Sequence, residues 1–128
     1  MRSALVCAMT FALGASTSAL AQELVALSGD QDAAIHSVVS SRLREPESAQ
    51  FRDVIAATDP SLEGMIWVCG MVAGRNGFGG ISDFAPFMGS LVTENSGQEQ
   101  FVLISLAGQQ PDEQERVLNT CLARMPRR

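Results

Sequence analysis

The run Met65–Ala73 constrains the fold of this chain most, because it has no polar side chain at any position. Strands that alternate apolar and polar residues bury one face, whereas a short continuous apolar run is typical of a strand inside a sheet. Successive side chains of a strand point to opposite faces, so Trp67 and Val68 make both faces apolar. The run therefore predicts a central strand.

Three further strands are predicted around this run, over residues 51–57, 83–92 and 101–106. They are separated by segments rich in Gly, Pro, Asn and Asp, the residues that favour turns. Pro86 falls inside the third predicted strand and has no backbone N–H to donate. We therefore expect the part of that strand around Pro86 to lie at an edge or a bulge.

A helix is predicted on each side of the strands in the sequence. Residues 29–44 follow a capping box formed by Ser28 and Gln31, and Pro46 ends this helix. Pro111 opens the second helix, whose apolar side chains share one face. The order of helix, four strands and helix predicts an α+β fold in two layers, an antiparallel sheet with both helices on one face.

The first residues have the layout of a secretory signal peptide. Arg2 precedes an apolar stretch over residues 4–13, and Ala-Leu-Ala at residues 19–21 fits a cleavage site. Cleavage there would leave one small exported domain, residues 22–128, in the periplasm or outside the cell and without a membrane span. The alternative is a retained membrane anchor, because the uncharged run 3–22 is nearly long enough to cross a bilayer. Its second half is only weakly hydrophobic.

Two cysteines remain after the predicted cleavage, since Cys7 belongs to the signal peptide. In an oxidising compartment an even pair indicates a disulfide. Cys69 falls on the predicted central strand and Cys121 on the apolar face of the last helix, so both point inward. We predict a Cys69–Cys121 disulfide; two buried free thiols are the alternative.

Charge and composition disfavour several functions. The predicted mature chain keeps all fourteen acidic residues and eight of the nine arginines, a net charge of −6 that argues against nucleic acid or anionic lipid as a partner. Lysine and tyrosine are absent, which excludes Schiff-base lysine and tyrosine nucleophiles. His36 is the single histidine, so a zinc site is disfavoured. We predict no metal, no cofactor and no catalytic residue.

The glycine-rich segment 74–80 is the candidate binding site. It precedes a strand and lacks the lysine of a P-loop, which disfavours phosphate binding. Two interpretations stay open. The segment is either a bulged hairpin whose glycines serve turn geometry alone, with Asn76-Gly77 as its tightest point, or a recognition loop presenting Arg75, Asn76 and Phe78 on a rigid sheet.

A resemblance is carried, in order, by the segments Glu45–Phe51, Cys69–Val72 and Arg75–Gly80. They resemble a group of small exported bacterial proteins, many of them lipoproteins of unassigned function. The pattern of that group runs Lys-Asp-Pro-x-Ser-Ala-x-Phe and then Cys-Gly-x-Val-Asn-x-Lys-Asn-x-x-Gly-Gly-Tyr. The similarity covers residues 43–87, and this chain departs from it at Ala73 and Ile81, where the group has Asn and Tyr. The resemblance implies export and no particular activity.

Together these features predict an exported, non-enzymatic module that contacts an envelope protein through the hairpin 74–83. An inhibitor or accessory subunit of a periplasmic enzyme is the alternative. A small hydrolase using His36 is disfavoured, because the chain has so few acid–base groups.

Overall fold

The computed structural model describes residues 22–76 and 78–126. Helix α1 (Gly29–Ser40) and a short 3₁₀ turn, η1 (Pro46–Ser48), precede the sheet, and helix α2 (Pro111–Arg124) follows it. The strands are β1 (Gln50–Thr58), β2 (Met65–Ala73), β3 (Ala85–Thr93) and β4 (Glu99–Leu106). They form one antiparallel sheet in the order β1-β2-β3-β4, so each strand pairs with its neighbours in sequence. The predicted α+β class and the central position of β2 are confirmed.

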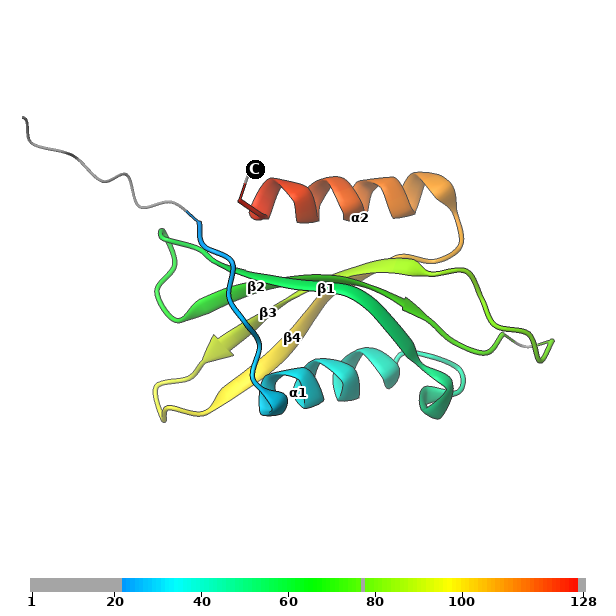
Figure 1. The fold of residues 1–128 in the computed structure, drawn as a ribbon, viewed down its shortest axis with the longest axis horizontal. Helices are drawn as coiled ribbons and strands as arrows, with labels where there is room; N and C mark the ends of the chain where they lie inside the picture. Colours follow the sequence, from blue (N-terminus) through cyan, green and yellow to red (C-terminus); the bar gives the residue numbers. More distant parts are fainter. Residues whose placement is uncertain (1–21, 77, 127–128) are drawn as a thin grey trace, which may run out of the picture.

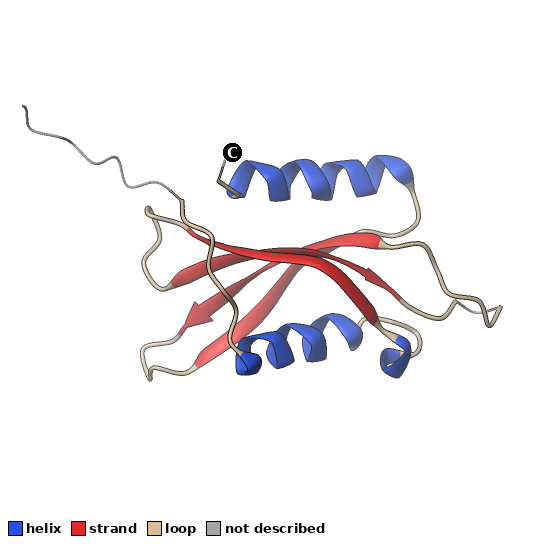
Figure 2. Cartoon of the chain, in the orientation of Figure 1, coloured by secondary structure: helices blue, strands red, loops and turns tan. Residues whose placement is uncertain are grey.

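The two helices cover opposite faces of the sheet (Figures 1 and 2). The prediction of two layers with both helices on one face is therefore wrong; the fold has three layers. Val68 and Val72 of β2 pack in the cluster beneath α1, whereas Trp67 and Cys69 pack in the cluster beneath α2. A strand that is apolar on both faces needs a cover on each, and the two helices supply one each.

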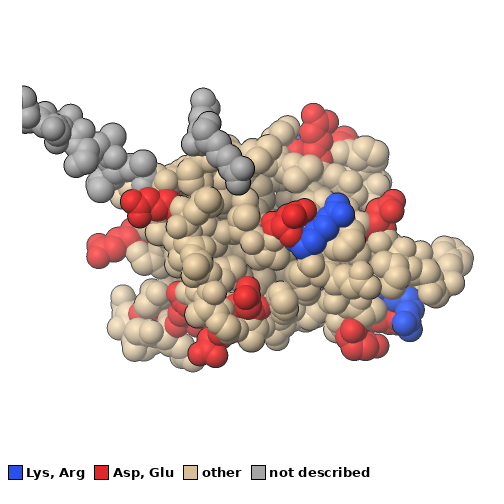
Figure 3. All heavy atoms as spheres, in the orientation of Figure 1, with Lys and Arg blue, Asp and Glu red and all other residues tan. Residues whose placement is uncertain are grey.

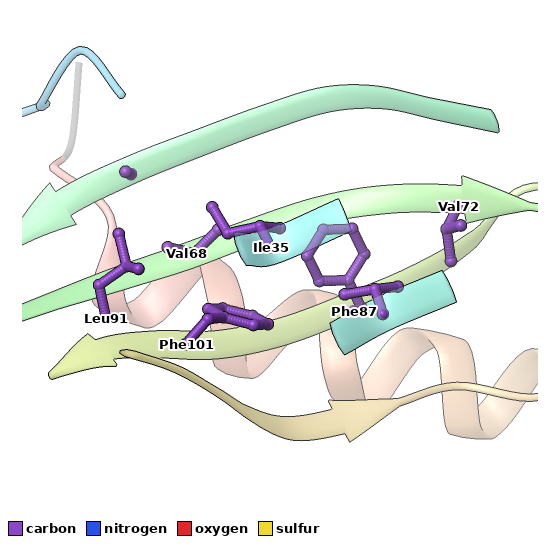
Figure 4. Close-up of a cluster of buried hydrophobic side chains, with 8 residues drawn as sticks. Ile35, Val68, Val72, Phe87, Leu91 and Phe101 are labelled. Atoms are coloured by element: carbon purple, nitrogen blue, oxygen red, sulfur yellow. The ribbon is translucent and has the colours of Figure 1, made fainter. Parts of the chain in front are cut away.

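The larger of the two cores lies between α1 and the sheet. Ile35 and Val39 of α1 are fully buried there. The sheet supplies a matching set of side chains, shown with Ile35 in Figure 4: Val68, Val72, Phe87, Leu91 and Phe101. These residues come from three adjacent strands, so α1 holds the middle of the sheet together.

Helix α1 ends at Ser40, before the predicted end at Arg44. The capping box at its start is present as predicted, with Ser28 and Gln31 bonded reciprocally. At its end the Ser41 hydroxyl donates to the carbonyl of Val38 at 2.6 Å. Serine hydroxyls compete in this way for backbone carbonyls, and they end the helix earlier than Pro46 requires.

Pro86 lies in β3, an inner strand, so the expectation of an edge strand is wrong. The pairing of β3 with β4 does change register close to Pro86, between Met88 and Gly89. The carbonyl of Pro86 accepts a hydrogen bond from the N–H of Ala107 at 3.0 Å, just past the end of β4. The N–H and C=O of a strand residue point to the same side. The missing donor of Pro86 therefore faces the end of β4, and the pairing with β2 is unaffected.

Helix α2 is attached to the other face by a small apolar cluster and a covalent bond. Its buried residues are Val117 and Cys121, and Met125, just beyond its end, is buried in the same cluster. Cys121 forms the predicted disulfide with Cys69 of β2, across a Cα–Cα distance of 5.9 Å. The neighbouring Leu118 and Leu122 are exposed, so α2 has a narrow buried face.

Trp67 belongs to the same layer and is fixed by two polar neighbours. Its indole N–H donates to Asp59 Oδ2 at 2.9 Å, and the guanidinium of Arg124 lies 4.7 Å from the ring centre. The other carboxylate oxygen of Asp59 accepts bonds from the backbone and the hydroxyl of Ser61. These hydrogen bonds, first from Ser61 and then from Trp67, lower the pKa of Asp59 below its ordinary value of 3.8.

Asp59 should therefore make stability depend on acidity. A carboxyl group whose folded-state pKa is lowered stabilises the fold above its unfolded-state pKa, and the contribution disappears as the pH falls through the folded-state pKa. We expect Asp59→Asn to flatten the decrease in melting temperature between about pH 5 and pH 2. Asp83→Asn, at an exposed position, is the control. Equal pH profiles for wild type and Asp59→Asn would contradict this account.

The segment before α1 pairs with the outer edge of β1, a feature that the sequence patterns do not predict. Val25 N–H donates to the carbonyl of Ala56, and Thr58 N–H donates to the carbonyl of Glu23, both at 2.9 Å. The predicted signal peptide, residues 1–21, lies outside the described residues. Neither helix in the described part of the chain is long and apolar enough to cross a membrane.

Candidate functional site

The predicted binding residues lie in the connection between β2 and β3. This connection, residues 74–84, extends away from the sheet at the right of Figure 1. Arg75 and Ile81 form an isolated bridge at its base, and Ser82 N–H donates to the carbonyl of Gly74 at 2.8 Å. The predicted hairpin is therefore present. Gly77, half of the predicted Asn-Gly turn, lies outside the described residues.

Asn76 organises the tip of the hairpin from within. Its side-chain Oδ1 accepts hydrogen bonds from the N–H groups of Phe78 at 2.9 Å and Gly80 at 3.1 Å. Its backbone N–H donates to the carbonyl of Gly80 at 2.7 Å. Gly79 has φ +83°, a conformation that favours glycine. Asn76 thus shapes the loop, with its Oδ1 engaged inside it, while the predicted contact role of this residue stays a prediction.

Phe78 is fully exposed, with 100% of its surface accessible to solvent. Its N–H is bound to Asn76, so the backbone beneath the ring is fixed while the ring itself faces water. Ile81 follows on the returning strand and is half exposed. Sequence reasoning did not include Ile81 in the site, although an isoleucine beside a glycine-rich turn is a visible signal. The tip therefore presents two apolar side chains close together in sequence.

Arg75 connects the hairpin to the segment after α1. Its backbone N–H donates to Ser48 Oγ at 2.8 Å, and its Nε lies 3.5 Å from Glu45 Oε2. The hydroxyl of Ser48 in turn donates to the carbonyl of Glu45 at 2.6 Å. Glu45 Oε2 is buried and accepts no hydrogen bond from the described residues. The guanidinium of Arg75 is therefore the charge partner of this oxygen.

This contact brings together the segments that carry the sequence resemblance. η1 and the Arg75–Gly80 segment are far apart in the chain, yet Ser48 supports the backbone at Arg75. The side chain of Arg75 remains half exposed, at 53%, so it supports the hairpin and also reaches its surface. The predicted residues Arg75 and Phe78 are therefore both accessible at one end of the molecule, whereas their binding role stays a prediction.

Two other chemically capable side chains, those of His36 and Asp59, are engaged in ring stacking or local hydrogen bonds. The His36 ring stacks on Phe51, with ring centres 4.0 Å apart and planes 9° from parallel. Asp59 is bound to Ser61 and Trp67. Within residues 22–76 and 78–126, no three His, Cys, Asp or Glu side chains are grouped as metal ligands. These positions point to structural roles for His36 and Asp59.

The surface charge is mainly acidic. Figure 3 shows acidic side chains spread over the visible face, and few basic ones. Two of the described arginines are in ion pairs, Arg52 with Asp53 and Arg75 with Glu45. Comparison of the chain with protein-family models, with curated proteins and with solved structures gives no significant match. The resemblance described from the sequence stays a prediction.

Proposed function

We propose that the protein is an exported, non-enzymatic binding module that contacts a protein of the cell envelope through the tip of the β2–β3 hairpin. The observation that carries the proposal is the complete exposure of Phe78 on a loop whose backbone is bonded internally. A soluble domain gains nothing in stability from an aromatic ring that touches none of its own core. The ring is therefore available for contact with a partner.

The chemistry of the tip suits protein recognition. Aromatic residues and arginine are enriched among the residues that dominate binding energy at protein interfaces. Phe78 and Arg75 provide one of each, and Ile81 adds apolar surface. Because Asn76 and Ser48 already hold the loop, binding would order few additional groups, which reduces its entropic cost.

The proposal places the protein in the periplasm or outside the cell. The support is the Cys69–Cys121 disulfide, a bond that persists in oxidising compartments, together with the signal-peptide pattern of residues 1–21. The acidic net charge supports a protein partner over nucleic acid.

Site-specific photo-crosslinking in the native host tests the proposal. A photoreactive phenylalanine analogue at position 78 should yield one dominant adduct, and the same analogue at Leu62 should not. Leu62 is a matched control because it is an exposed apolar residue, 45% accessible, in the β1–β2 loop. Arg75→Ala should reduce the adduct at least about tenfold, as loss of a contact worth 1.4 kcal/mol would do. Adducts at both positions, or at neither, would contradict the proposal.

A stability measurement separates contact from folding. Phe78→Ala should leave the melting temperature within about 2 °C of wild type, since exposed substitutions change stability by at most about 0.5 kcal/mol. Unfolding of this variant would show that Phe78 is structural. If the adduct is an enzyme, its stoichiometric inhibition by the purified protein would identify the protein as an inhibitor.

A further inference from the structure

We propose that the free edge of β4 is a self-association surface, on which a second copy of the chain adds its own β4 in antiparallel orientation. β4 is the last strand of the sheet, and no segment in the described ranges pairs with its outer side. An unpaired edge strand presents N–H and C=O groups that can continue a sheet into another chain.

β4 carries few of the features that usually block such pairing. Between Gln100 and Leu106 it has no charged residue and no proline. Val102 is 43% exposed and Ile104 is 51% exposed, on the face of the sheet that α2 covers mainly over β3 and β2. Ile104 also lines a surface hollow together with Val117 of α2. Apart from Glu99 at its start, β4 is thus an exposed, largely apolar edge strand, and such a strand is a site for strand addition.

The opposite edge of the sheet is protected. Residues 23–25 pair with the end of β1 and occupy its outer hydrogen-bonding groups. Further along β1 a bulge interrupts the register, Asp53 has φ +53°, and Arg52 lies 3.6 Å from its carboxylate. Bulges and charges are the usual protection of edge strands. β4 also has a register shift, beyond the Gly89–Leu103 pair, but its stretch up to Leu103 is regular and no segment of the described residues pairs with its outer side. This stretch is therefore the edge available for pairing.

The charges along β4 and α1 argue for a second copy as the occupant. α1 lies alongside β4 (Figure 1). Near the start of α1, Glu99 Oε1 accepts a hydrogen bond from Gln31 Nε2 at 3.0 Å. Beyond the end of α1, Arg42 and the segment 103–106 line a cavity of about 320 Å³. Arg42 has no ion pair among the described residues.

In a two-fold symmetric dimer, Glu99 of one copy would lie close to Arg42 of the other. If two β4 strands pair antiparallel about a centre between Phe101 and Leu103, Glu99 of each copy lies beside residues 103–107 of the other. That is where Arg42 borders its cavity. Two-fold symmetry repeats each contact, so both ion pairs form together. A strand of an unrelated protein would have no fixed acidic residue at the position opposite Arg42, whereas β4 of a second copy has Glu99 there.

The expected dimer is weak. β4 is regular up to Leu103, and its register with β3 shifts beyond the Gly89–Leu103 pair. The regular stretch is short, and one short strand pair with a few side chains falls at the small end of protein interfaces. We therefore expect a dissociation constant on the order of 10 µM.

Sedimentation velocity of the purified full chain tests the proposal with a matched pair of variants. Val102→Lys places a charge on the β4 edge, and Ile55→Lys places one on β1 at the same exposure, 43% against 42%. Wild type and Ile55→Lys should dimerise alike, whereas Val102→Lys should raise the dissociation constant at least about tenfold. A wild type that stays monomeric at about 200 µM, or equal effects of the two lysines, would overturn the proposal.

Charge exchange tests the orientation independently of Val102. Arg42→Glu and Glu99→Arg should each weaken the dimer about threefold to tenfold, and the double exchange should restore it to within about twofold of wild type. Circular dichroism establishes that each variant is folded before its association is compared. Failure of the double exchange to restore association would exclude the antiparallel two-fold arrangement.

Discussion

Cys121→Ala is expected to lower the free energy of unfolding by about 4 kcal/mol. The disulfide closes a sequence separation of 52 residues, and a loop of that size gives about this value in the chain-entropy account. The fold has little to replace it, because α2 buries only Val117 and Cys121, with Met125 just beyond its end, while Leu122 is 65% exposed. The covalent bond is therefore the main attachment of α2.

Chemical denaturation with and without a reductant measures this effect. Cys69→Ala should give the same loss as Cys121→Ala, and the reductant should destabilise wild type but neither variant. Hydrogen exchange should show protection lost first in α2 and retained in β2 and β3, which the α1 core still holds. A change below about 1 kcal/mol would mean that packing alone holds the helix.

Gly89→Ala is expected to destabilise the sheet by about 3 kcal/mol. Gly89 lies on β3 beneath the ring of Phe101, and a Cβ atom there would collide with that ring. The same atom would lie 2.5 Å from the carbonyl oxygen of Val102, a backbone atom that cannot rotate away. Overpacking of a filled core costs about 1–3 kcal/mol, and a backbone obstacle places this site at the upper end.

Gly29→Ala provides the matched control for this substitution. Gly29 begins α1, and a Cβ atom there would meet nothing within 4 Å. The free energy of unfolding of the Gly29→Ala variant should stay within about 0.5 kcal/mol of wild type or rise slightly, because alanine favours the helix. Equal melting temperatures for Gly89→Ala and wild type would show that Phe101 adopts another position without cost.

The elements of this fold follow closely from local patterns. Apolar content predicts β2 at its observed bounds, and Pro111 marks the start of α2. The placement of α1 and α2 on opposite faces depends on which face of the sheet the apolar side of each helix packs against. No local sequence pattern contains that information. The pairing of residues 23–25 with β1 is also not predictable from local patterns, because it requires knowing that β1 is an edge strand of the folded sheet.

In the hairpin, too, some features follow from the local sequence and others depend on contacts between residues that are distant in the chain. Glycine content predicts a shaped loop, and its turn residues include Asn76. The bonds of Ser48 and Glu45 to Arg75 join residues that are distant in sequence, so no spacing rule predicts them. The complete exposure of Phe78 is also invisible to a pattern, because phenylalanine is more often buried than exposed.

The strand order has a consequence for how the chain reaches this state. Because β1 to β4 are neighbours in sequence and in space, the sheet can form hairpin by hairpin through contacts of short range. α2 is the last element in the sequence and contains Cys121. Cys69 on β2 therefore cannot form its disulfide until α2 packs on the sheet. Oxidation is then expected to be a late step that locks a helix onto a finished sheet. A cell short of oxidant would accumulate molecules with an ordered sheet and a loose C-terminal helix.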